Sequence, residues 1–179
     1  MKEFSSQKDL SHYPVMLDQV MQICEPEKGG YYVDCTFGTG GYSNAILSSP
    51  KTKVIALDRD SYSKKYAEKT KNNYRERFSF YNGKFGDLKK IVKNEEKFDF
   101  IIFDLGVSSL QIFNLNKGFS FNSKSEIDMN MGHNSISVKD VLNNFSLSTL
   151  NDIIKFLGEE KESFRIAKNI TNERKKKPI

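Results

Sequence analysis

The chain has 179 residues, 28% of them charged and 37% apolar, a balance that excludes a disordered chain. Its net charge of +5 allows a nucleic-acid partner without requiring one. The cysteines, Cys24 and Cys35, lack C-x-x-C spacing, so we expect buried, inert thiols in a reducing compartment. The first ten residues are polar, and no run reaches the roughly 18 apolar residues of a membrane helix, so we expect a cytoplasmic protein with no membrane partner.

The first 58 residues predict the start of a parallel α/β sheet. An amphipathic helix is predicted to begin at Pro14, because proline suits the first helical position. Residues 31–36 are aromatic or β-branched, which favours a buried strand. A glycine turn and a helix over 44–49 follow, and an apolar strand over 53–58 ends on an acid. This order is typical of a βαβ unit.

The same alternation continues to residue 104. A lysine-rich helix is predicted over 61–72, a short strand over 78–81, a short helix over 88–93 and a strongly apolar strand over 98–104. Strands that alternate with helices indicate a parallel, doubly wound sheet. With right-handed crossovers and a reversal after the third strand, the order is 3-2-1-4, and a cofactor lies over the carboxyl ends of strands 1 and 4.

The pattern changes after Asp104. Residues 105–133 form a long loop rich in Gly, Ser and Asn, and loops of this length in a compact domain are usually functional or disordered. Three helices are then predicted, over residues 137–144, 148–157 and 160–174. We therefore expect residues 1–133 to hold the core with its active-site loop and 134–179 to form a helical insertion. The basic end at 174–177 is either a solvated helix terminus or an RNA contact.

The glycine loop after the first strand is predicted to be the ligand site. It contains Gly38, Gly40 and Gly41, which let the backbone turn where a side chain would clash. The loop departs from the dinucleotide pattern G-x-G-x-x-G, since Ser43 stands at the third glycine position. The acid at the strand end, Asp34, suits a ligand with ammonium and sulfonium charges, which favours S-adenosylmethionine. An ordinary βα turn remains the alternative.

Two acids after the second and third strands fit a bound nucleoside. Asp58 ends the second strand, where an acid can accept hydrogen bonds from both ribose hydroxyls. Its alternative role is that of a helix N-terminal acid, together with Asp60 and Ser61. Asp87 can reach an adenine amino group and Phe85 can pack on its face. Turn chemistry and core packing are the alternatives for these two.

The turn that starts at Asp104 carries an acid and hydroxyls directly after an apolar strand. An ion at the end of a buried strand needs partners or a function. The acid is either a functional group or is satisfied by the backbone amides of 106–109. Downstream, 117–121 and 127–131 bring aromatic residues and a carboxylate into the loop. These aromatics either stack on a base or form the loop's own small core.

Taken together, these motifs resemble the bacterial ribosomal RNA small subunit methyltransferase H family. They are His12-Tyr-Pro-Val15, Asp34-Cys-Thr-Phe-Gly-Thr-Gly-Gly-Tyr-Ser43, Asp104-Leu-Gly-Val-Ser-Ser109, Lys117-Gly-Phe-Ser-Phe121, Ile127-Asp-Met129 and Gly158-Glu-Glu160. The resemblance implies a class I methyltransferase fold, with a helical insertion after the fourth strand, that methylates N4 of a cytidine in 16S ribosomal RNA of the small subunit. It implies S-adenosylmethionine contacts at Gly40, Gly41, Tyr42, Asp58, Phe85, Asp104 and Gln111.

The chemistry implied is direct transfer of a sulfonium methyl group to an exocyclic amine, with no metal required. Asp104 and Ser108 are the candidates for orienting that amine and accepting its proton. The sequence departs from the family's pattern at three positions: Tyr42 stands for histidine, and Lys117 and Asn130 stand for arginine. Lysine keeps the charge without bidentate geometry, and asparagine loses the charge.

The family also has a second arm of the sheet, with Asn-x-Glu-Leu and Phe-His-Ser-Leu-Glu-Asp-Arg segments that this sequence does not contain. We therefore expect an incomplete sheet of about four strands, whose strand over 98–104 is an apolar edge open to self-association. One alternative function is an inactive or weakly cofactor-binding fragment. A nicotinamide-dependent dehydrogenase is the other, and Asp34 and the absent third glycine count against it.

Overall fold

The computed structural model describes residues 14–92, 97–108, 111–112, 114–123, 127–132 and 136–179. The chain divides into two compact units, Met1–Ser108 and Ser109–Ile179. The sequence instead predicted a functional division between residues 133 and 134, and that division stays a prediction.

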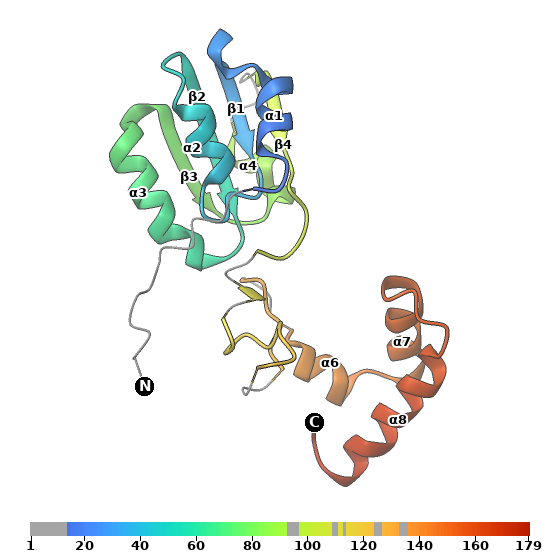
Figure 1. The fold of residues 1–179 in the computed structure, drawn as a ribbon. Helices are drawn as coiled ribbons and strands as arrows, with labels where there is room; N and C mark the ends of the chain where they lie inside the picture. Colours follow the sequence, from blue (N-terminus) through green and yellow to red (C-terminus); the bar gives the residue numbers. More distant parts are fainter. Residues whose placement is uncertain (1–13, 93–96, 109–110, 113, 124–126, 133–135) are drawn as a thin grey trace, which may run out of the picture. The chain divides into compact units, whose positions relative to one another are not determined.

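The first unit is built on a parallel sheet in the order β3-β2-β1-β4 (Figure 1). Its strands are β1 (Gly30–Asp34), β2 (Thr52–Asp58), β3 (Phe78–Asn82) and β4 (Phe100–Ile102). The predicted Rossmann-like α/β fold class and strand order are confirmed. In this order the carboxyl ends of all four strands lie at one edge of the sheet.

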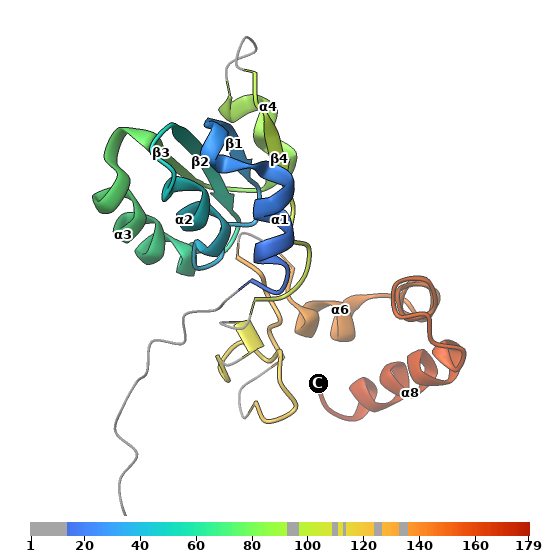
Figure 2. The ribbon, with the colours of Figure 1, turned by 45° about the horizontal axis from the view of Figure 1, so that its top comes forward.

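Helices cover both faces of this sheet. They are α1 (Leu17–Cys24), α2 (Gly41–Leu47), α3 (Lys64–Tyr74) and α4 (Leu88–Ile91), with short 3₁₀ turns at Pro26–Lys28, Ser61–Ser63, Arg75–Arg77 and Phe85–Asp87. In Figure 2, α1, α2 and α3 lie together on one side of the strands. Residues of these three helices share one core with the sheet, whereas α4 packs against a second core on the other face.

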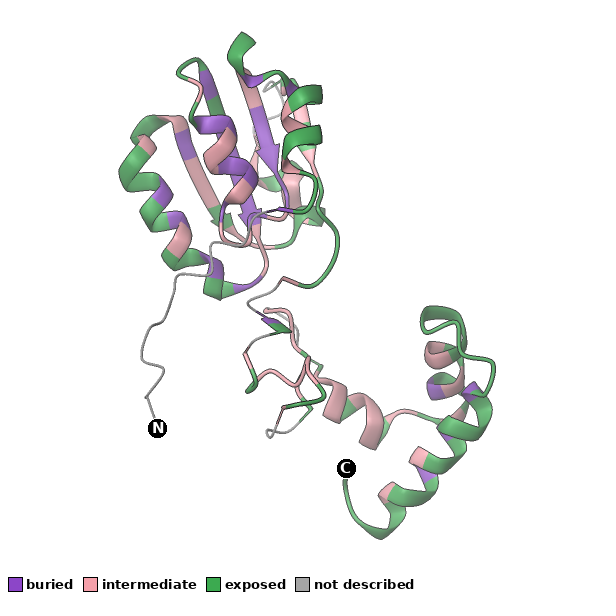
Figure 3. Ribbon diagram, in the orientation of Figure 1, coloured by how far each residue is buried: buried purple, intermediate pink, exposed green. Residues whose placement is uncertain are grey.

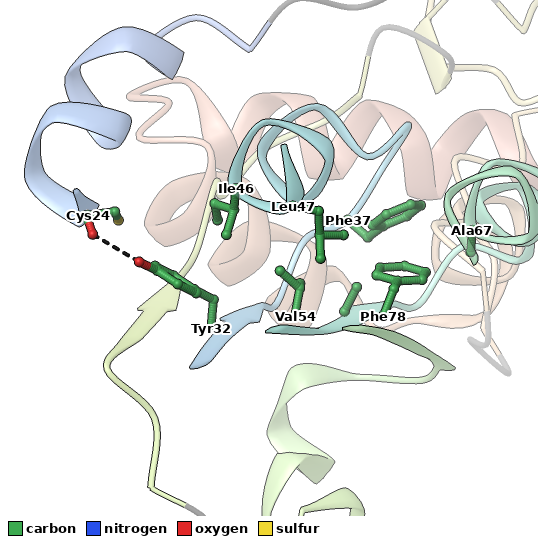
Figure 4. Packing of buried hydrophobic residues seen from close by; sticks show 9 residues of the cluster. Cys24, Tyr32, Phe37, Ile46, Leu47, Val54, Ala67 and Phe78 are labelled. Carbon is green, nitrogen blue, oxygen red and sulfur yellow. Dashed lines mark hydrogen bonds between the residues drawn. The ribbon is translucent and has the colours of Figure 1, made fainter. Parts of the chain in front are cut away.

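Burial is concentrated in β1, β2 and α2 (Figure 3). Figure 4 shows the larger core, in which Ile46, Val54 and Phe78 pack closely. The Tyr32 hydroxyl donates to the Cys24 carbonyl at 3.0 Å, which ties α1 to β1. Both cysteines are free and buried, as expected from the sequence.

Several predicted boundaries in this unit are shifted; the helix predicted over 44–49, for example, is α2 at Gly41–Leu47. Two of the shifts have a clear cause. The first helix begins at Leu17, because the Pro14 carbonyl accepts the Leu17 N–H at 3.2 Å and closes a turn first. Strand β4 is shorter than 98–104, since only residues 100–102 pair with β1. Ahead of it, the Asp99 carboxylate takes the Tyr31 N–H at 2.7 Å. The Asp99 N–H also donates to the Tyr31 carbonyl at 2.9 Å, so one backbone bond and one side-chain bond join the strands ahead of the paired residues.

Strand β4 lies at an edge of the sheet among the described residues. Ile101 is 48% exposed, although the strand's composition suggested full burial. Self-association through this edge stays a prediction, which sedimentation over a range of chain concentrations will test.

The second unit contains the three predicted helices with shifted ends. They are α6 (Val138–Asn144), α7 (Leu147–Asp152), which continues as a π-helical turn over Ile153–Leu157, and α8 (Ser163–Lys176). Ser137 and Asp140 form a capping box at the start of α6. Arg174, part of the basic end, donates to the Leu142 carbonyl at 2.7 Å and so fastens α8 to α6. No helix in the described part of the chain is long and apolar enough to cross a bilayer.

Candidate functional site

The loop after β1 is fixed to the strands on both sides of it. The Cys35 N–H donates to the Ile102 carbonyl at 2.9 Å, at the end of β4. The Phe37 N–H donates to the Leu57 carbonyl at 2.9 Å, near the end of β2. The Phe37 ring is buried against Phe78 and Phe80 of β3, with centroid distances of 5.6 and 5.3 Å. The loop therefore starts from a rigid base over the carboxyl ends of the strands.

Glycine is required at the turn into α2. Gly38 and Gly40 have φ values of +56° and +88°, in the left-handed region that other residues rarely adopt. A Cβ on Gly40 would lie 2.8 Å from both the Phe37 ring and the Asn44 amide nitrogen. That amide also donates to the Gly40 carbonyl at 2.7 Å. The backbone is thus close-packed beneath the loop, which holds it in one conformation.

Asp58 is partly exposed at the end of β2 and supports the loop from the second strand. One carboxylate oxygen accepts the Gly38 N–H at 2.6 Å, and the other accepts the Asp60 N–H at 2.8 Å. Each oxygen keeps a second lone pair for a further donor. The capping role considered for this acid belongs to Asp60, whose carboxylate accepts the Tyr62 N–H at 3.1 Å. Asp58 therefore has acceptor capacity left for a ligand.

Asp34 does not have the role expected from its position, since its side chain is 0% exposed. Its oxygens accept the Ser43 hydroxyl at 2.7 Å and the Thr36 N–H at 3.2 Å. Burial raises the pKa of this carboxyl from 3.8 to about 6, and the two hydrogen bonds oppose the rise. The expected direct contact between Asp34 and a cationic ligand is therefore wrong, because the carboxylate braces the loop from inside.

Replacing Asp34 with asparagine is expected to remove a pH-dependent loss of stability. The folded pKa lies above the unfolded one, so the unfolded chain releases this proton first, and stability falls as the pH rises from about 4 to about 6. A shift of about two pH units corresponds to roughly 3 kcal/mol. Asparagine still accepts from Thr36 and donates to the Ser43 oxygen, so the loop is kept. Urea unfolding between pH 4 and 7 measures the difference between the two proteins, which must grow with pH.

Asp104 lies just beyond β4 and is exposed, so it needs no internal partners for its charge. The premise of a buried ion at this strand end is wrong. Its backbone N–H donates to the Thr36 hydroxyl at 2.8 Å, which joins the turn after β4 to the loop after β1. Ser108 is partly buried at the end of the same unit. Both catalytic candidates therefore follow β4 in the chain, and Asp104 lies at the edge that carries the glycine loop.

Tyr42 is buried, although the resemblance implies a ligand contact at this position. Burial first and the charge of Asp104 second raise the pKa of its phenol, and a hydrogen bond from the Met16 backbone opposes them. The Tyr42 side chain therefore links α2 to the start of α1, while neighbouring Gly41 is partly exposed.

Two aromatic rings are exposed on the α4 side of this edge. Phe85 is 44% exposed and meets Phe103 edge to face, with ring centroids 5.4 Å apart and an interplanar angle of 86°. The predicted acid Asp87 is instead engaged by Lys90 at 2.5 Å, an ion pair that lowers the pKa of its carboxyl. This contact agrees with the alternative of local turn chemistry for Asp87.

The remaining predicted residue, Gln111, is buried and belongs to the second unit. In that unit the Met129 N–H donates to the Lys117 carbonyl at 2.7 Å, which brings the two loop motifs together. Phe121 is fully exposed and Met129 is 40% exposed, so neither fits the alternative of a small loop core. His12, the first residue of the resemblance, lies outside the described residues.

Sequence reasoning missed three supporting side chains, namely Thr36, Ser43 and Asn44. Each bonds to a residue of the predicted site, as described above. None of the three belongs to a sequence motif whose spacing predicts such a contact. The contact between Asp34 and Ser43 spans nine positions that include a complete turn. Only the absence of a third glycine at Ser43 hinted at a different role there.

These features define a Rossmann-like α/β domain whose candidate ligand site is a glycine loop at the carboxyl edge of the sheet. The chain belongs to the MraW methylase family, whose sequence model matches residues 9–179, and this confirms the resemblance.

Curated relatives agree with this assignment. Ribosomal RNA small subunit methyltransferase H of Rickettsia akari (strain Hartford) is 45% identical over 165 residues, which cover 92% of this chain and 54% of that protein. The proteins of the same name from Ehrlichia canis (strain Jake) and Orientia tsutsugamushi (strain Boryong) are each 41% identical, over 94% of this chain and 58% and 54% of their own lengths. The chain thus spans about half the length of the curated relatives it matches.

Proposed function

We propose that this chain takes part in S-adenosylmethionine-dependent methylation of N4 of a cytidine in 16S ribosomal RNA. The observation that carries the proposal is the convergence of the glycine loop with two accessible carboxylates, Asp58 and Asp104, at one edge of the sheet. Membership of a methylase family and the names of the relatives support the reaction type and the RNA substrate. A cytoplasmic location follows from a ribosomal substrate.

The residues of the first unit fit a nucleoside carrying a charged tail. The close-packed glycine turn holds the loop backbone in one conformation, and Gly41 at the start of α2 is partly exposed, so a ligand can approach the backbone there. Asp58 has lone pairs for two ribose hydroxyls, and the exposed ring of Phe85 offers a face for a base. When bound, S-adenosylmethionine supplies an activated methyl group on a sulfonium. The proposed holding set from this unit is Gly40, Gly41, Tyr42, Asp58, Phe85 and Asp104; Gln111 of the second unit is proposed on the resemblance alone.

Asp104 and Ser108 are the proposed groups for the acceptor amine. The lone pair of cytosine N4 is delocalised into the ring, so N4 needs an acceptor that orients it and takes its proton. Asp104 is exposed, and its backbone N–H donates to the Thr36 hydroxyl. This bond fixes the position of the Asp104 backbone, from which the carboxylate extends. Most of the remaining acceleration comes from holding the reacting atoms in line.

A comparative ligand titration tests the proposed cofactor. Calorimetry with S-adenosylmethionine and with NAD on the same preparation should detect binding of the first and none of the second. Binding of NAD alone would favour the dehydrogenase alternative. Binding of neither ligand would contradict the proposal and favour an inactive fragment. Because the test needs no RNA, it separates ligand recognition from turnover.

Asp104→Asn and Ser108→Ala are expected to slow methyl transfer while leaving cofactor binding measurable. Loss of a proton acceptor reduces such a rate by about 10²–10⁴-fold. Single-turnover methylation of small-subunit RNA, measured with saturating cofactor, reports this step. The Lys161→Ala variant, on an exposed residue of the second unit, serves as the matched control. Normal rates in both variants would refute the assignment, and absence of turnover in the unsubstituted chain would favour a cofactor-binding fragment.

The RNA partner is proposed to meet the second unit. Phe121 is fully exposed and can stack on an unpaired base, and Lys117 lies in the same motif. Lys175 and Lys176 are exposed at the end of α8 and add positive charge for phosphates. Asn130 contributes no charge, so this contact relies on lysines and stacking. We expect the affinity for RNA to fall steeply with salt.

A further inference from the structure

Phe103 lies one residue beyond β4 and is 49% exposed, although it is a large aromatic side chain. The sequence motifs assign it no role, and the resemblance assigns ligand contacts only to its neighbour Asp104. Its position at the carboxyl edge of the sheet is the position at which parallel α/β sheets bind ligands. An exposed aromatic ring at this position can contact a bound ligand.

The side-chain alternation of β4 places Phe103 on a defined face. Phe100 and Ile102 pack against the core beneath α1, α2 and α3. Successive side chains of a strand point to opposite faces, so Ile101 and Phe103 belong to the α4 side. Phe85, which directly precedes α4, contacts Phe103 on that side. The alternation of side chains along β4 thus brings Phe103 to the side of the sheet on which Phe85 lies.

The pair also bridges the sheet. Phe85 follows β3 and Phe103 follows β4, and these are the two outer strands of the order β3-β2-β1-β4. Their contact therefore lies across the ends of β2 and β1, from which Asp58 and the glycine loop arise. The two rings meet edge to face at 86°, so the edge of one ring lies against one face of the other, and each side chain still keeps nearly half of its surface exposed. Exposed ring faces next to a nucleoside site are suited to a flat heterocycle.

We propose that Phe103 is the second aromatic wall of the subsite for the ligand's base and helps determine its specificity for a purine. This inference rests on the proposed function, since it takes the ligand to be a nucleoside. Phe85 supplies one wall and Phe103 the other, at right angles, while Asp58 holds the ribose. The subsite thus recognises the base by shape and stacking.

The absence of tryptophan from the chain allows a direct optical test. In Phe103→Trp the introduced residue is the only tryptophan of the chain. When S-adenosylhomocysteine is added, stacking of its purine on the indole should quench the tryptophan fluorescence. Ile101→Trp is the matched control, because Ile101 lies on the same side of β4 and is equally exposed, at 48%. Its emission should change little. A quench in the control and none at position 103 would overturn the proposal.

Affinity measurements provide a second, independent test of the role of Phe103. Phe103→Ala should weaken binding of S-adenosylhomocysteine about tenfold or more, as expected for the loss of one stacking ring. Phe103→Tyr should bind within about threefold of the unsubstituted chain, since the ring face is kept. A role in packing alone would instead lower the unfolding midpoint of Phe103→Ala and leave the affinity of the folded protein unchanged, which would refute the proposal. Failure of the unsubstituted chain to bind at all would refute the proposed function, so the two failures are distinguishable.

Discussion

Replacing Gly40 with alanine is expected to abolish detectable binding of S-adenosylmethionine and to destabilise the first unit. The residue has φ +88°, which costs a non-glycine residue roughly 1–2 kcal/mol. Its new Cβ would also lie 2.8 Å from the buried Phe37 ring, and overpacking of this kind costs about 1–3 kcal/mol. The sum is about 2–5 kcal/mol in the free energy of unfolding. Relief of the clash displaces the turn that faces the ligand.

Two other glycines separate the cost of the backbone conformation from the cost of the steric clash. Gly38 also has a positive φ, +56°, but a Cβ there meets nothing closer than 3.9 Å. Gly38→Ala should therefore show only the conformational cost, roughly 1–2 kcal/mol. Gly86→Ala is the matched control, since its φ is ordinary and its Cβ would enter open space. Urea unfolding and calorimetry on the three variants should rank Gly40 first in both effects, and equal losses at Gly40 and Gly86 would contradict the steric argument.

The sheet was predictable because its strands have a strong local signal. Val54, Ile55 and Leu57 form an apolar run, and that run is buried on both faces as β2. The order 3-2-1-4 then followed from general rules on crossover handedness. Composition and connectivity therefore sufficed for the fold class of the first unit.

The ends of elements were less predictable, because single hydrogen bonds decide them. At the start of β4, Asp99 donates its N–H to the Tyr31 carbonyl but accepts the Tyr31 N–H with its carboxylate, and regular pairing with β1 begins one residue later. Before α8, Glu159 adopts φ +51° and the Glu160 carboxylate accepts the Glu162 N–H at 2.8 Å. The helix therefore begins at Ser163, although the apolar period suggested Glu160. No period in the sequence reports such contacts.

The site was predicted in its location but not in the role of each acid. The sequence places Asp34, Asp58 and Asp104 at strand ends, and a pattern cannot distinguish a buried carboxylate from an accessible one. In the structure Asp34 is fully buried, Asp58 is partly exposed and Asp104 is exposed. The difference follows from Ser43, whose hydroxyl satisfies Asp34 from within the first turn of α2. Three acids of one pattern thus have three different environments.

Replacing Asp58 with asparagine is expected to weaken binding of S-adenosylmethionine about 100-fold and to lower the free energy of unfolding by about 1–3 kcal/mol. Both oxygens of Asp58 accept backbone N–H groups, from Gly38 at 2.6 Å and from Asp60 at 2.8 Å. The amide nitrogen of asparagine would face one of these donors, so one N–H loses its acceptor, and the ribose loses one as well. The same substitution at Asp34 is compatible because the Ser43 hydroxyl can reverse its bond.

Asp99→Asn is the matched control for this prediction. Asp99 is an acid at the opposite end of the strands whose carboxylate accepts the Tyr31 N–H, a bond that an amide oxygen can also accept. Calorimetry should find the affinity of Asp99→Asn for S-adenosylmethionine unchanged, while Asp58→Asn loses about two orders of magnitude, or roughly 2.7 kcal/mol. If Asp58→Asn is destabilised but binds as tightly as the unsubstituted chain, Asp58 only holds the loop. Unchanged stability with lost affinity would instead assign its whole effect to the ribose, because the backbone bonds would then contribute nothing.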